Sequence, residues 1–144
     1  MKPTLFTIGA LIAWSWACQP ATAGMTVLKS DDNFKAQAGA EPNDKNPLEG
    51  KLVIRLEGSG GWKVSPEAPL VIDLSPPEGL SLAKTKLKNT DKDDPKSGAP
   101  SLAVSYTAKA KGRYPVKLKF DVVLCTEKMC QKKRFESEFP LDAG

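Results

Sequence analysis

The stretch VKLKFDVVLCTEKMCQKKRFESEF, residues 116–139, decides the fold of this chain. In its first half the even positions are apolar and most odd positions are charged, as expected of a strand with one face on a core. The apolar positions are Val116, Leu118, Phe120, Val122 and Leu124. The second half returns with Phe135 and Phe139 on one parity and charged residues on the other. The stretch therefore predicts a β-hairpin with one buried and one wet face.

Two cysteines, Cys125 and Cys130, flank the loop of this hairpin and share the parity of its charged face. If they lie directly opposite each other, the register of the whole hairpin follows. That register forms three oppositely charged pairs and two apolar pairs: Lys117–Glu138, Lys119–Glu136, Asp121–Arg134, Phe120–Phe135 and Val116–Phe139. Cross-strand pairs of these kinds stabilise a sheet by roughly 0.2–1 kcal/mol each. The fit is poorer near the loop, where Leu124 would face Gln131, which leaves room for a bulge.

The rest of the chain also reads as short strands separated by turns. Apolar residues alternate with polar ones in two further segments: Leu52, Ile54 and Leu56, then Leu102, Val104 and Tyr106. Turn sequences such as GSGG at 58–61 and PPEG at 76–79 recur between such segments. Seven or so short strands without a convincing helix predict an all-β, immunoglobulin-like antiparallel β-sandwich. We assign it to residues 49–144, as one domain ending in the cysteine-bearing hairpin.

Two polar segments lack this alternation. Residues 24–48 are rich in Asp, Ala, Asn and Pro, and we expect a loop there, with room for one edge strand. Lys84 to Pro100 is a charged loop that contains Pro and Gly and that should bury little. It is expected to be a mobile connection, and a charged docking loop is the functional alternative.

The first residues, MKPTLFTIGALIAWSWACQPATAG, have the pattern of a secretory signal peptide. A lysine precedes an apolar run, and Ala21-Thr22-Ala23 then supplies a cleavage site, so residues 1–23 should be removed. The run is shorter than the roughly 20 apolar residues that span a bilayer. Lipidation of Cys18 is the competing interpretation, which the bulky Trp16 disfavours. We expect a periplasmic or secreted protein without a membrane span, in an oxidising setting where Cys125 and Cys130 form an even pair.

Composition excludes several classes of function. Among the 144 residues there is no histidine, which removes Ser–His and Cys–His dyads and the commonest zinc and copper ligands. The net charge of +4 comes from 21 basic and 17 acidic residues mixed along the chain, and aromatic residues make up 7%. A nucleic-acid-binding face needs clustered basic and aromatic residues. We therefore expect no nucleic acid partner and no bound cofactor or metal.

The spacing of Cys125 and Cys130 leaves three interpretations open. A structural disulfide is the plainest, but a ring of about six residues stabilises the fold by only about 2 kcal/mol in the chain-entropy model. Redox exchange is the second, because the neighbouring Lys128, Lys132 and Lys133 favour thiolates. A Cu(I) site formed with Met129 is the third.

Three segments together resemble a known family: GWKVSPEAPL at 61–70, PPEGL at 76–80 and FDVVLCTEKMC at 120–130. They are similar to the N-terminal periplasmic domain of the thiol:disulfide interchange protein DsbD, the disulfide bond corrector family, over roughly residues 50–141. The resemblance implies an immunoglobulin-like domain that relays electrons from a membrane-embedded reductase to periplasmic thioredoxin-fold proteins. It also implies that Cys130 forms the mixed disulfide with partners and that Cys125 resolves it.

With the resemblance, redox exchange through Cys125 and Cys130 becomes the leading prediction, for a monomeric electron carrier like a thiol–disulfide oxidoreductase. The alternatives are a secreted structural or binding sandwich with a purely structural disulfide and, after it, a Cu(I)-binding protein. The chain departs from the family by carrying no membrane domain and no thioredoxin-like domain, so its electrons should come from a separate protein. The aromatic cap of the family has no clear counterpart, since Trp62 and Tyr106 are expected to be core residues.

Overall fold

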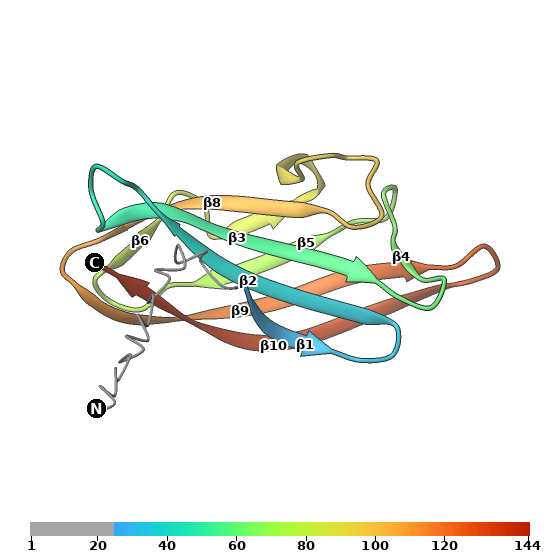
Figure 1. Ribbon diagram of the computed structural model, residues 1–144. Helices are drawn as coiled ribbons and strands as arrows, with labels where there is room; N and C mark the ends of the chain where they lie inside the picture. The colour runs from blue at the N-terminus through green and yellow to red at the C-terminus, as the bar shows by residue number, and fades with distance from the viewer. Residues whose placement is uncertain (1–24) are drawn as a thin grey trace, which may run out of the picture.

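The computed structural model describes residues 25–144, which form two packed antiparallel sheets (Figure 1). The predicted signal peptide and Cys18 lie outside these residues. The strands are β1 (Thr26–Ser30), β2 (Phe34–Pro42), β3 (Glu49–Gly58), β4 (Lys63–Val64), β5 (Val71–Ser75), β6 (Leu80–Leu82), β7 (Lys86–Lys88), β8 (Ser101–Ala108), β9 (Gly112–Cys125) and β10 (Cys130–Ala143). One 3₁₀ turn, η1 (Asn89–Asp91), follows β7.

The first sheet has the strand order β1-β2-β3-β8-β6, and the second has the order β10-β9-β5-β7, with the short β4 paired to β9. The alternating apolar residues of both sheets face each other and form one core, so the predicted immunoglobulin-like all-β sandwich is confirmed. All the alternating apolar positions named above in β3, β8 and β9 are buried. Tyr106 is also buried, and Trp62 is partly buried against the core, as expected of both.

The β9–β10 hairpin has the register predicted from the cysteines. Pairing runs without interruption from Cys125–Cys130 to Gly112–Ala143, so there is no bulge beside the loop. The rings of Phe120 and Phe135 stack with centroids 4.5 Å apart. All three predicted charge pairs lie opposite each other, but among the described residues only Asp121 and Arg134 are in contact, at 3.2 Å. The register therefore depends more on the apolar face than on the outer ion pairs.

The expected loop at 24–48 is wrong in one respect. The edge strand exists as β1, but β2 also forms and pairs with both β1 and β3 inside the sheet. Its inward side chains, Phe34, Ala36 and Ala38, are fully buried. Alanine carries little hydrophobic signal, so the alternation in FKAQAGA is weak although the burial is complete.

The charged segment from Lys84 to Pro100 buries more than expected. Strand β7 pairs with β5 and inserts Leu87 fully into the core. Lys92 is only 6% exposed, and its burial lowers the pKa of its ammonium group. The part of the segment around β7 therefore belongs to the sandwich, whereas residues 93–99 form a loop of exposed and half-buried residues.

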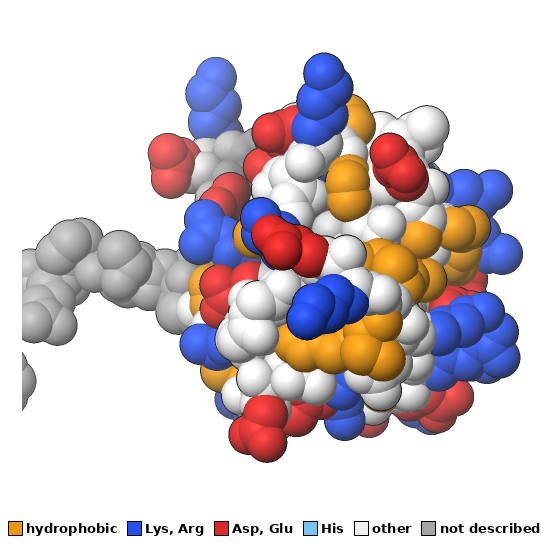
Figure 2. All heavy atoms as spheres, turned by 90° about the vertical axis from the view of Figure 1, so that its right-hand side faces the viewer, with side chains coloured by type: hydrophobic (Ala, Val, Ile, Leu, Met, Phe, Trp, Pro, Cys, Tyr) orange, Lys and Arg blue, Asp and Glu red, His pale blue; other side chains and the backbone are white. Residues whose placement is uncertain are grey.

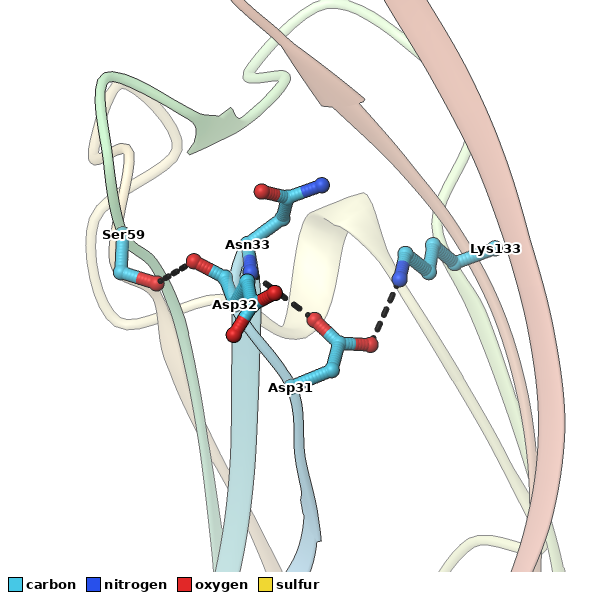
Figure 3. Close-up of polar contacts among 5 residues, drawn as sticks. All are labelled: Asp31, Asp32, Asn33, Ser59 and Lys133. Atoms are coloured by element: carbon cyan, nitrogen blue, oxygen red, sulfur yellow. Dashed lines mark hydrogen bonds and ion pairs between the residues drawn. The ribbon is translucent and has the colours of Figure 1, made fainter.

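A polar cluster joins the turn between β1 and β2 to the other sheet (Figure 3). Lys133 of β10 contacts the Asp31 carboxylate at 2.6 Å, and the backbone N–H of Asn33 donates to the same carboxylate at 3.0 Å. The Ser59 hydroxyl donates to the carbonyl of Asp32 at 2.8 Å. These contacts connect the edges of the two sheets close to the cysteine-bearing end of β10.

The Lys133–Asp31 contact predicts an acid dependence of stability. The hydrogen bond from Lys133 lowers the pKa of Asp31 below its usual 3.8. The pair therefore stabilises the fold fully above that value, and the contribution is lost as the pH falls through the lower folded pKa. Asp31→Asn should lower the free energy of unfolding by about 0.5–1 kcal/mol at neutral pH. Urea titrations should show this difference from wild type disappearing in acid, and a difference independent of pH would contradict the assignment.

Candidate functional site

The cysteines lie at the tip of the β9–β10 hairpin, at one end of the sandwich (Figure 1). Hydrogen bonds of Thr126 organise the turn between them. Its backbone N–H donates to the carbonyl of Met129 at 2.7 Å, and its hydroxyl accepts from the backbone N–H groups of Lys128 and Met129 at 3.2 and 3.1 Å. These hydrogen bonds within the turn hold the ends of both strands in register next to the loop.

Cys125 and Cys130 are joined by a disulfide, with a Cα–Cα distance of 4.0 Å. Such a short separation is typical of a non-hydrogen-bonded pair, in which side chains on one face approach most closely. The two cysteines differ in exposure, since Cys125 is half-buried and Cys130 is exposed. Of the two residues, Cys130 is therefore the more accessible, while Cys125 lines the groove described below.

Strand β4 places a lysine on the other side of Cys125. Lys63 pairs directly with Cys125, and Val64 pairs with Leu124. Val64 and Leu124 are both buried, so the alternating Lys63 and Cys125 share the outer face. No sequence pattern predicts this neighbour, because a strand of two residues has no periodicity.

A shallow groove lies beside Cys125, between β4 and the hairpin tip, with a volume of about 610 Å³. Its lining is mostly apolar or uncharged and includes Gly60, Gly61, Val64 and Pro66. The two glycines have φ values of 62° and 88°, a conformation that favours glycine. The backbone there thus lies open beside the cysteines without side chains over it.

The lysines near the disulfide fall into two groups. Lys132 contacts Asp121 at 3.7 Å, and Lys133 is held by Asp31. Lys63 and Lys128 line the groove and form no ion pair with any residue of the described range 25–144. The groove therefore carries two cations available to an approaching molecule. One acid, Glu127, lines the same groove at the hairpin tip.

The soft-metal interpretation combines Met129 with the two cysteines. Met129 is 60% exposed at the tip, and both cysteine sulfurs are bonded to each other. Within residues 25–144, no three His, Cys, Asp or Glu side chains come together in a metal-binding arrangement. The same residues contain no helix with the length and apolar character needed to cross a membrane.

Comparison with known proteins supports the fold. No protein-family model matches the chain. No curated protein sequence matches it either. Among solved structures, the GAE domain of GGA2p from Saccharomyces cerevisiae has a TM-score of 0.53 at 12% identity, over 84% of this chain and 100% of that one. This score shows a shared β-sandwich fold.

Two other solved structures have lower scores. The yeast GGA1 GAE domain has a TM-score of 0.44 at 15% identity, over 82% of this chain and 100% of that one. The N-terminal periplasmic domain of ScsB from Proteus mirabilis has a TM-score of 0.42 at 10% identity, over 81% of this chain and 50% of that one. Scores at this level add nothing to the fold assignment, so the function must be argued from the site.

Proposed function

We propose that this chain is an exported thiol–disulfide exchange domain that relays electrons between a membrane reductase and periplasmic thioredoxin-fold proteins. Cys125 and Cys130 are the proposed catalytic residues. The observation that carries the proposal is the asymmetry of the disulfide, with an exposed Cys130 and a half-buried Cys125 beside an open groove. Lysines around the pair favour thiolates. The family resemblance, which rests on 61–70, 76–80 and 120–130, supports the same activity.

The proposed cycle transfers two electrons to a partner. The Cys130 thiolate attacks the partner disulfide, so that a Cys130–partner bond forms and one partner sulfur leaves as a thiolate. The Cys125 thiolate then attacks Cys130 Sγ, forming the intramolecular disulfide and releasing the second partner sulfur. The two protons lost from the dithiol end on the two partner thiols. A reductase thiolate that attacks the exposed Cys130 begins the return, with Cys125 leaving as a thiolate.

A location outside the cytoplasm is part of the proposal and rests on the secretory pattern of residues 1–23. The runner-up is a secreted sandwich in which the disulfide only closes the hairpin. The two functions differ in how easily the bond is reduced, because structural disulfides typically lie below about −300 mV and exchange-active ones lie higher.

The reduction potential of the Cys125–Cys130 bond tests the proposal. The purified protein would be equilibrated with glutathione buffers, with copper excluded, and its thiols trapped and counted. We expect a potential near or above about −250 mV, within reach of thioredoxin-like couples. A value well below about −300 mV would instead identify a structural disulfide. Retention of Cu(I) by the dithiol form would favour the metal-binding alternative.

A further inference from the structure

We propose that the groove beside Cys125 is a subsite for the partner segment next to the partner's reactive cysteine, and that it selects an apolar residue flanked by carboxylates. The inference rests on the proposed exchange function and adds the chemistry of the segment that is recognised. It assigns Lys63 and Lys128 a role in partner selection, in addition to the effect of nearby lysines on the thiolates.

The position of the groove follows from the order of the strands. Strand β9 lies between β10, which carries Cys130, and β4, which carries Lys63. A partner bonded to Cys130 whose chain crosses β9 therefore passes over Cys125 and reaches the groove. Two inter-strand spacings are about 10 Å, and an extended chain advances about 3.3 Å per residue. The residue about three positions from the partner's cysteine would then lie in the groove.

The lining selects the chemistry of that residue. Pro66 and the exposed backbone of Gly60 and Gly61 offer apolar and backbone surface, which suits an apolar side chain. Figure 2 looks onto this end of the molecule, where hydrophobic side chains lie in patches among lysines and acidic residues. Contact with such surface would be short-ranged and would not by itself distinguish partners.

Charge supplies the selectivity. Lys63 and Lys128 line the same groove, both are exposed, and neither is neutralised by another residue of the range 25–144. The charged residues of the groove lining are Lys63, Lys128 and Glu127. Outside it, Glu57 lines a neighbouring hollow together with Lys63, and Lys132 already contacts Asp121. The balance at the groove is therefore positive, which complements carboxylates on either side of the inserted residue.

Short peptides test the inference directly. The probes are Cys-Gly-Glu-Leu-Glu and Cys-Gly-Lys-Leu-Lys, each also made in the reverse direction, with the cysteine as a mixed disulfide to nitrothiobenzoate. The protein is reduced with dithiothreitol, freed of it, and mixed with each peptide, and the coloured thiol is followed. In at least one direction, the acidic peptide should react about three- to tenfold faster than the basic one. The ratio should fall toward one at about 1 M salt, where the screening length is about 3 Å.

Charge reversal provides the decisive comparison. The double variant Lys63→Glu/Lys128→Glu should invert the preference and favour the basic peptide. The matched control, Lys109→Glu/Lys111→Glu, removes the same charge from the exposed turn before β9, at the other end of the sandwich, and should keep the wild-type ratio. Thermal unfolding should show that both variants remain folded.

The outcomes separate the two proposals. A small uncharged disulfide serves as the reference substrate, and the peptide rates of each protein are divided by its own reference rate, so that a change in thiolate reactivity cancels. If wild type reduces this reference but does not prefer the acidic peptide, or if the double variant keeps the preference, the groove is not the subsite and the exchange function stands. If wild type reduces neither the reference nor any peptide, the exchange function and the subsite both fail.

Discussion

Replacing Phe120 by alanine should lower the free energy of unfolding by about 3–5 kcal/mol, the usual range for a buried phenylalanine. Phe120 is 1% exposed and lies in the middle of β9, between Ile72 of β5 and Phe135 of β10. Its ring stacks on Phe135, which in turn packs edge-on against Phe34 of the other sheet at 5.6 Å. Truncation therefore opens a cavity and breaks a chain of aromatic contacts that crosses the sandwich.

Urea denaturation of wild type and variant measures this loss. A domain of this kind has a total stability of about 5–15 kcal/mol, so the variant would lie close to the folding threshold. Phe135→Ala is the matched control, because Phe135 is the half-buried member of the stacked pair and should cost less, about 1.5–3 kcal/mol. If Phe135→Ala lowered the free energy of unfolding more than Phe120→Ala does, Phe120 would not be the more buried member of the stacked pair, as described.

The contrast between these strands shows what the sequence could predict. In β9, large apolar residues alternate with lysines, and a one-residue shift would expose the whole apolar face, so fold and register were both predictable. In β2, the buried residues are mostly alanines, and their burial depends on pairing with β1 and β3 rather than on local hydrophobicity. The burial of Leu87 likewise depends on the pairing of β7 with β5.

The candidate site also has a part that the sequence predicts and a part that it does not. The facing cysteines follow from the parity of one hairpin, which is a local property of the sequence. The groove and the position of Lys63 depend on β4, a two-residue strand that pairs with β9 although β5, β6, β7 and β8 separate the two along the chain. No pattern near Lys63 could report that contact. The residues that would react were therefore predictable, whereas those that would select a partner were not.

The two single-cysteine variants should differ in whether they form a stable mixed disulfide with a partner. Cys125→Ala keeps the exposed Cys130 thiol, so it should attack a partner disulfide and then remain bound, because no second thiol releases the partner. Cys130→Ala keeps only the half-buried Cys125 and should form no stable adduct. Both variants would also carry Cys18→Ser, so that a single thiol remains. Each would be mixed with an oxidised thioredoxin-fold protein and its adduct measured on a non-reducing gel.

The adduct yields of the two variants can be compared because the two proteins should be equally stable. Both variants lose the same small ring, which is worth about 2 kcal/mol, so their unfolding curves should shift equally. A difference in adduct formation between two equally destabilised proteins then reports the reactivity of the sulfurs and not the fold. Equal trapping by both variants would show that the difference in exposure does not direct the attack. Absence of any adduct, with both variants folded, would leave the disulfide as a clasp for the hairpin, because an accessible Cys130 thiol that attacks no partner disulfide cannot begin the exchange cycle.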